Sequence, residues 1–184
     1  MKSDIRNSII LILFFTILCG VIYPLLITII AKICFPYQAE GSIIQVEGKK
    51  VGSYLIGQSF EKEDSFWGRP SETQYRFSVA SNRAIKNEAY QKEKQKRREF
   101  LKQTSYNNKE VPEDLLTYSA SNVDPNITVE AAYFQVDRIA LKRKKKTEEI
   151  EKLINEHSIN YGILGTRMVN VLELNLALDK LEKR

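Results

Sequence analysis

Apolar and polar positions divide this chain into two parts of different character. No charged residue occurs from Asn7 to Ala31, whereas Lys, Arg, Asp and Glu recur throughout the sequence behind this run. A helix rises about 1.5 Å per residue, so the run can cross a hydrocarbon core of roughly 30 Å. The pattern predicts a short N-terminal segment at residues 1–8, a transmembrane helix at 9–31 and a polar domain at 32–184.

A cleaved signal peptide is the alternative interpretation of this apolar run. Signal peptides carry apolar cores of roughly 7–15 residues, which is shorter than the run found here. No small-x-small cleavage site precedes the polar domain, and the residues before Cys19 and Cys34 do not fit a lipoprotein site. The sequence therefore favours a retained anchor, with a kink expected at Pro24.

The charges that flank the run predict its orientation. Lys2 and Arg6 precede it, and Lys32 is the only cation close behind it. The positive-inside rule then predicts a cytoplasmic N-terminus and an extracytoplasmic domain. Because both cysteines lie in or just after the apolar run, the polar domain has none with which to form an internal disulfide.

The first half of the polar domain shows two clear patterns. β-rich runs at residues 42–47 and 51–56 flank a turn at Gly48–Lys50, which predicts a hairpin. A highly charged run from Asn87 to Gln103 predicts a helix that is mostly solvated. Between them, aromatic residues alternate with Gly, Pro and Arg from Phe66 to Phe77, which indicates a packed loop.

Helices are concentrated late in the chain. Thr128 is a suitable N-cap for a helix whose apolar positions recur at i, i+4, i+7 and i+8, and Thr147 can cap a further one. Asn170 and Glu173 have the spacing of a capping box before a last helix. The predicted fold class is α+β, with one N-terminal transmembrane helix followed by a mixed α/β extracytoplasmic domain.

Composition and motifs narrow the functional classes. The net charge of +5 suits anionic lipid head groups or an acidic partner, and no nucleic-acid recognition motif accompanies it. The single histidine, His157, lies on an apolar helix face, and no Cys/His cluster, G-x-S-x-G elbow or Walker A loop occurs. The chain is therefore not expected to be an enzyme on its own. By elimination, it is expected to serve a larger membrane complex.

The loop with Trp67, Arg69 and Pro70 is the most distinctive local string. Arg69 could stack on Trp67 or Phe66, although plain loop packing is favoured over a binding role. Together with Asp124, these residues are expected to matter for structure or for an interface.

Several blocks carry a family resemblance through their order and spacing. They are Gly52–Phe60, Phe66–Ser71, Val111–Thr117, Ser119–Ile127, Glu130–Val136, Arg138–Ala140 and Leu164–Leu178. In this order they resemble the C subunit of the Kdp-type potassium-transporting ATPases, over nearly the whole chain. The last block also contains Asn170 and Asn175, which we include among the expected structural or interface residues.

The resemblance implies a non-catalytic subunit of a high-affinity, ATP-driven potassium uptake pump in the bacterial cell (inner) membrane. The implied partners are a channel-like potassium-translocating subunit, a P-type ATPase catalytic subunit and a very small membrane subunit, besides membrane lipids. The implied role is support of assembly and of the nucleotide affinity of the complex. No cofactor is expected to be firmly bound, and ATP would act through the complex.

The chain departs from the family pattern at a stretch likened to a nucleotide-contacting signature. The family has Ser-Gly-Gly-Ser-Asn where this chain has Ser78-Val79-Ala80-Ser81-Asn82, so Ser78, Ser81 and Asn82 are the candidate nucleotide-related residues. The two added Cβ atoms make close phosphate approach harder, and the predicted orientation puts the loop away from cytoplasmic ATP. The family also has Gly at Ala120 and Asn122, and His at Asn126.

A second class of function remains open from sequence alone. The chain could be a stand-alone, membrane-anchored extracytoplasmic binding or sensor domain. The charged helix at Asn87–Gln103 would then be its contact face.

Overall fold

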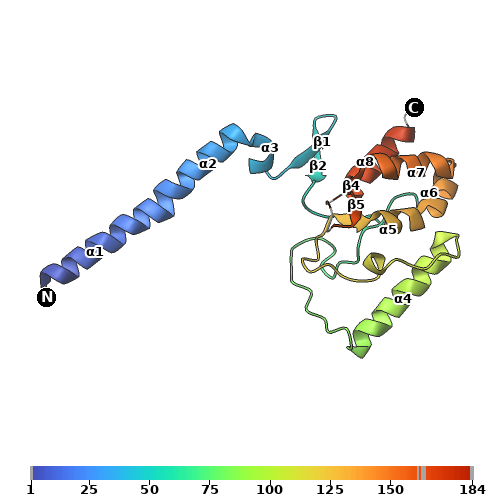
Figure 1. Ribbon diagram of the computed structural model, residues 1–184, viewed down its shortest axis with the longest axis horizontal. Coiled ribbons are helices and arrows are strands. Elements are labelled where there is room, and N and C mark those ends of the chain that lie inside the picture. The colour runs from blue at the N-terminus through green and yellow to red at the C-terminus, as the bar shows by residue number, and fades with distance from the viewer. Residues whose placement is uncertain (1, 161, 163–164, 183–184) are drawn as a thin grey trace. The chain divides into compact units, whose positions relative to one another are not determined.

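The computed structural model describes residues 2–160, 162 and 165–182. The chain forms two compact units, Met1–Val51 and Gly52–Arg184. Both helix and strand are present, so the predicted mixed fold class is confirmed (Figure 1). The predicted limits of the transmembrane and flanking segments stay predictions.

The first unit is built around one long apolar helix. It comprises α1 (Lys2–Ile17), one π-helical turn (Leu18–Ile22) and α2 (Tyr23–Cys34). From Ser3 to Cys34 it is long and apolar enough to cross a membrane, and none of its most apolar stretch is buried in protein. The predicted anchor is therefore present as a continuous helix.

The π-helical turn ends two residues before Pro24. Proline has no N–H to donate, and its ring clashes with the carbonyl four residues earlier. A π turn is wider than an α turn and relieves this conflict without ending the helix. The Thr28 hydroxyl also donates to the Pro24 carbonyl over 2.7 Å. The helix thus accommodates Pro24 within its own backbone.

A short helix, α3 (Pro36–Ala39), precedes the predicted hairpin of β1 (Ile43–Val46) and β2 (Lys49–Ser53). The turn is Glu47–Gly48, one residue earlier than predicted. Both residues have positive φ, 52° and 76°. Two consecutive positive φ angles define the two-residue hairpin turn whose twist matches that of paired strands, and glycine at the second position favours it.

The second unit packs four late helices with a small antiparallel sheet. The sheet order is β3–β5–β4, and Ile127 on β3 faces Val169 on β5 in the register, both fully buried. α7 contacts α5, α6 and α8, and α8 and α5 both contact β5. The bounds are β3 Asn126–Thr128, α5 Val129–Phe134, α6 Val136–Arg143, α7 Thr147–Glu156, β4 Ser158–Asn160, β5 Arg167–Asn170 and α8 Val171–Glu182.

The charged helix α4 (Glu88–Ser105) follows a long irregular segment, and a 3-10 turn (Glu113–Leu115) comes next. Most of α4 is exposed, as its composition predicted, but Tyr90 and Leu101 are buried. The side chain of Asn87 accepts from the Tyr90 N–H over 3.1 Å and so begins the helix. The predicted helix at this position is confirmed.

Two of the three late N-caps are confirmed. Thr128 Oγ1 accepts from the Ala131 N–H, and Asn170 Oδ1 accepts from the Glu173 N–H, each over 3.1 Å. Thr147 is instead the first residue of α7 and makes no cap hydrogen bond there. The helix expected after Thr128 is also two helices, which meet at Gln135.

We expect replacement of Thr128 by alanine to lower the free energy of unfolding by about 1 kcal/mol, because one N–H at the start of α5 loses its partner. Chemical denaturation of the full chain in detergent, followed by the emission of its single tryptophan, measures the change. Thr147→Ala is the matched control, since that hydroxyl caps nothing. Equal losses in the two variants would contradict the assigned cap.

Candidate functional site

The loop Phe66–Trp67 crosses the interior of the second unit, and two side-chain amides hold its backbone. Asn175 Oδ1 accepts from the Phe66 N–H over 2.7 Å, and its Nδ2 donates to the Phe66 carbonyl over 3.0 Å. Gln135 does the same at Trp67, over 2.8 and 3.1 Å. Each amide thus supplies the donor and acceptor that a neighbouring strand would otherwise provide.

The indole of Trp67 lies between a cation and an aromatic ring. The Arg138 guanidinium carbon is 3.7 Å from the ring centroid, and Phe100 on α4 stacks at 5.6 Å between centroids. The arginine stacked on this ring is therefore Arg138 from α6, whereas Arg69, which the sequence offered as one possibility, has its own partners. The planar guanidinium over the ring face is a favourable cation–π arrangement.

Arg138 is the largest fully buried side chain among the described residues. It donates to the backbone carbonyls of Glu63 and Ser65 and to Gln135 Oε1, the last over 2.7 Å. Burial lowers the pKa of Arg138 to about 10, so it remains protonated at neutral pH. Its charge is held by carbonyl oxygens and by the Trp67 ring.

Arg69 joins two loops that are distant in sequence. Its guanidinium donates to the Thr117 carbonyl and hydroxyl and to the Tyr118 carbonyl, the last over 3.1 Å. It also forms an ion pair with Asp124 at 3.4 Å. The structure therefore brings the predicted residues Arg69 and Asp124 together, in a structural role.

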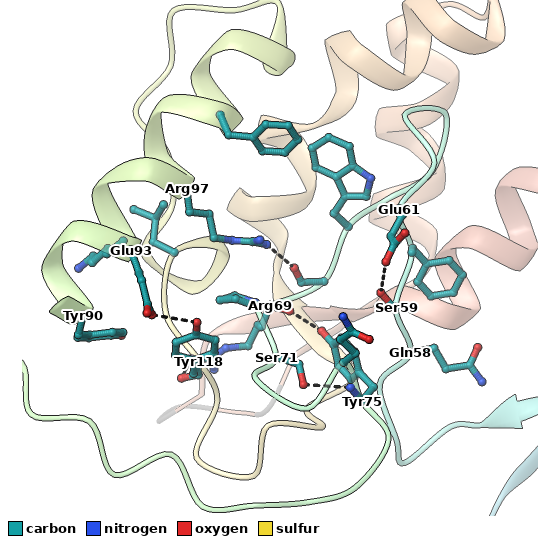
Figure 2. A pocket seen from close by; sticks show the side chains of 18 residues that line it. Gln58, Ser59, Glu61, Arg69, Ser71, Tyr75, Tyr90, Glu93, Arg97 and Tyr118 are labelled. Carbon is teal, nitrogen blue, oxygen red and sulfur yellow. Dashed lines mark hydrogen bonds between the residues drawn. The ribbon is translucent and has the colours of Figure 1, made fainter.

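Tyr75 fixes the far side of the same loop. Its hydroxyl donates to the Arg69 carbonyl, and its N–H donates to Ser71 Oγ over 3.0 Å (Figure 2). Burial raises the pKa of the Tyr75 phenol to about 12. A Cβ on Gly57 would lie 2.5 Å from the Tyr75 ring and 2.6 Å from the Asp124 carbonyl oxygen, so only glycine fits there.

A cleft of about 390 Å³ opens between this loop, the Gln58–Glu61 segment and α4 (Figure 2). Trp67, Arg69 and Pro70 line it, so three of the predicted residues meet at one site. Its remaining walls are mainly aromatic and charged side chains, among them Phe60, Tyr75, Tyr90, Glu93, Lys94, Arg97, Phe100 and Tyr118.

The two predicted asparagines lie elsewhere than in the cleft lining. Asn170 donates from Nδ2 to the Tyr54 carbonyl over 2.8 Å while its Oδ1 caps α8. Asn175 holds the Phe66 backbone as described. Asp124 accepts from the Asn126 N–H over 3.0 Å, and Asn126 pairs with Asn170 across the sheet. These residues act on the scaffold around the cleft.

The candidate nucleotide-related stretch is an exposed loop laid against residues 119–122. Ser78 Oγ donates to the Ser121 carbonyl, and the Ser81 N–H donates to the Ala120 carbonyl, each over 3.0 Å. Ser78 and Asn82 are exposed, and Ser81 is partly buried. None of the three lines the cleft. Ser78, Ser81 and Asn82 therefore share one loop, which is separate from the cleft that Trp67, Arg69 and Pro70 line.

Asn122 explains one departure from the resembled pattern. Its φ is +60°, a region that glycine adopts freely and that asparagine tolerates best among other residues. The buried side chain accepts from the Glu72 N–H and donates to the Val79 carbonyl over 2.7 Å. Asparagine therefore keeps the backbone shape and fastens the exposed loop.

Gln135, Arg138 and Arg97 are the site residues that sequence reasoning missed. Gln135 and Arg138 are three positions apart, within a helical pattern whose neighbours are apolar. A polar side chain on such a face is buried only when its polar atoms are hydrogen-bonded, so the positions of Gln135 and Arg138 could have indicated a buried polar contact. Arg97 could not be singled out from the sequence, because it lies in a run of cations. Among the described residues, no cluster of three or more His, Cys, Asp or Glu side chains fits a metal ion.

Among the described residues, the fold and site define a chain with one helix able to span a membrane and an α/β unit in which several polar side chains hold the loop backbone in place. A family model described as "K+-transporting ATPase, c chain" matches residues 5–180. The chain belongs to this family, the KdpC family.

Three curated relatives support the assignment, each named "Potassium-transporting ATPase KdpC subunit". The protein of Herminiimonas arsenicoxydans is 45% identical, covering 98% of this chain and 99% of its own. That of Herpetosiphon aurantiacus is 40% identical (99% and 98%), and that of Clostridium perfringens 40% (95% and 96%). The likeness therefore extends through both the apolar helix and the α/β unit.

Proposed function

We propose that this chain is a non-catalytic subunit of an ATP-driven potassium uptake pump and supports the assembly and stability of that complex. The observation that carries the proposal is the likeness to KdpC subunits along nearly the entire chain. The implied partners are the channel-like potassium-translocating subunit, the P-type ATPase subunit and the very small membrane subunit.

The proposed division of labour follows from the two units. The apolar helix has no ionisable side chain from Asn7 to Ala31, which suits packing on partner helices and lipid rather than an ion path. The α/β unit is proposed to lie outside the cytoplasm, in line with the positive-inside pattern, and to clamp the partners from that side. Its loops are held by buried side chains, as a preorganised interface requires.

Any effect on nucleotide affinity is proposed to pass through the complex. The Ser78 hydroxyl is already engaged with the Ser121 carbonyl, and Val79 and Ala80 carry Cβ atoms that hinder backbone approach to a phosphate. An orientation with the α/β unit outside the cell would also separate this loop from ATP. Support of the catalytic subunit through protein contacts is therefore favoured over direct binding.

Affinity purification of the tagged chain from mild-detergent membranes of potassium-starved cells tests the proposal. Recovery of a multi-span protein and a P-type ATPase in fixed ratio is the expected result. Recovery of this chain alone, while the pump is demonstrably expressed, would overturn it and leave the stand-alone anchored binding or sensor domain as the better explanation.

Replacement of Arg69 by alanine should lower recovery of the complex several-fold. The loop that Arg69 ties to Thr117, Tyr118 and Asp124 would lose its main crosslink, and Asp124 would lose its ion-pair partner. Co-purified partner per tagged chain is the measured quantity. Arg76→Ala removes an exposed cation from the same loop and should leave recovery unchanged. Unaltered recovery for Arg69→Ala would exclude it as an interface-supporting residue.

A further inference from the structure

Arg97 differs from the other cations that line the cleft. Arg69 is paired with Asp124, and Lys94 is paired with Glu113. Arg97 is half-buried and donates only to backbone carbonyls, from Nε to Leu115 and from Nη2 to Gly68. Among the described residues, no carboxylate lies within ion-pair distance of Arg97. Its position at the cleft wall, pointing from α4 toward the Gly68 loop, is visible in Figure 2.

A half-buried cation without a counter-charge is an unfavourable arrangement. Carbonyl oxygens compensate part of the lost hydration, but a full opposite charge compensates more. Burial also lowers the pKa of Arg97, and the nearby Tyr75 and Tyr118 hydroxyls oppose this effect only in part. The positive charge of Arg97 is thus not balanced by a carboxylate of the described residues, and an anion bound beside it in the cleft would compensate that charge.

The walls of the cleft specify the kind of anion. Glu61 and Glu93 line the same cleft and would repel a dianionic phosphate. The rings of Tyr90, Phe100 and Tyr118 instead suit an apolar stem that ends in a single negative charge. A volume of about 390 Å³ is within the size range of ligand pockets and admits a protruding side chain.

We propose that this cleft receives an acidic side chain of a partner subunit, whose carboxylate pairs with Arg97 while its stem packs against the aromatic wall. The inference rests on the proposed function as a complex subunit and names the contact by which this unit would hold its partner. An aromatic pocket with a central arginine is the composition typical of residues that dominate interface energies.

The first test compares variants for recovery of the complex from native membranes. Arg97→Gln should reduce co-purified partner at least about tenfold, because the partner carboxylate would be left buried without its cation. Lys96→Gln removes an exposed charge from the same helix and should leave recovery unchanged. If wild-type chain recovers no partner, the proposed function itself fails; if wild type and Arg97→Gln recover equal amounts, only the cleft contact is excluded.

A second measurement separates the contact from a folding defect. The thermal unfolding midpoint of the full chain in detergent is measured in sodium acetate, sodium phosphate and sodium chloride at equal ionic strength. We expect acetate to raise the midpoint of wild type above its value in chloride, and not to do so in Arg97→Gln. A larger rise in phosphate than in acetate, or no anion-specific rise, would overturn the carboxylate assignment.

Discussion

Replacing Arg138 by methionine is expected to lower the free energy of unfolding by about 3–5 kcal/mol, the largest loss for any single position considered. Methionine fills much of the same space but donates no hydrogen bond. The buried Ser65 carbonyl and Gln135 amide oxygen would each lose a donor, and so would the part-buried Glu63 carbonyl. The Trp67 ring would also lose the cation stacked on its face.

Arg138→Lys is the informative control for this prediction. Lysine keeps the charge but lacks the planar fork that reaches several acceptors at once, so an intermediate loss is expected. Far-UV circular dichroism during denaturation gives the free energy, because tryptophan emission itself depends on the removed contact. A methionine variant as stable as wild type would show that the guanidinium is not what holds the Glu63–Trp67 segment.

Asn175→Asp is expected to destabilise the second unit by about 2–4 kcal/mol at neutral pH. The wild-type amide donates to the Phe66 carbonyl from a buried position, and a carboxylate would place an acceptor against that oxygen. The introduced carboxyl should hold its proton in the folded state, so its folded pKa lies above its unfolded pKa of about 3.9.

The pH dependence of Asn175→Asp follows from that raised pKa. Below about pH 4 both states are protonated and the carboxyl can still donate to the Phe66 carbonyl, so the penalty is smallest there. As the pH rises from the unfolded pKa to the raised folded pKa, the unfolded state has released its proton while the folded state still binds one. The free energy of unfolding therefore falls over this range. Urea denaturation between pH 4 and 8 measures this slope relative to wild type. Asn155→Asp, at an exposed position on α7, should show little of it.

Local patterns were sufficient for the elements that local sequence determines. The apolar helix, the charged helix α4 and the Thr128 and Asn170 caps all rest on residues within a few positions of one another. The strands β4 and β5 were not predicted, because runs of three or four residues carry too little alternation to be recognised.

The interior polar contacts were beyond such patterns. Gln135 meets Trp67 across 68 positions, and Arg138 meets Ser65 across 73. Nothing near Trp67 in sequence indicates that Arg138, and not the neighbouring Arg69, will stack on it. The cleft likewise depends on α4 lying beside the Gly68 loop, a tertiary arrangement that periodicity does not encode.

The amide clamp on Phe66 has a consequence for the order in which the protein can be made. The partner of that backbone, Asn175, follows it by 109 positions and lies on the last described helix. In a growing chain the Phe66 peptide therefore lacks this partner until Asn175 has been synthesised and, for an exported domain, translocated. Structure with such long sequence separation forms late and slowly. The α/β unit should become protease-resistant only once α8 with Asn175 is available, after the apolar helix has been made.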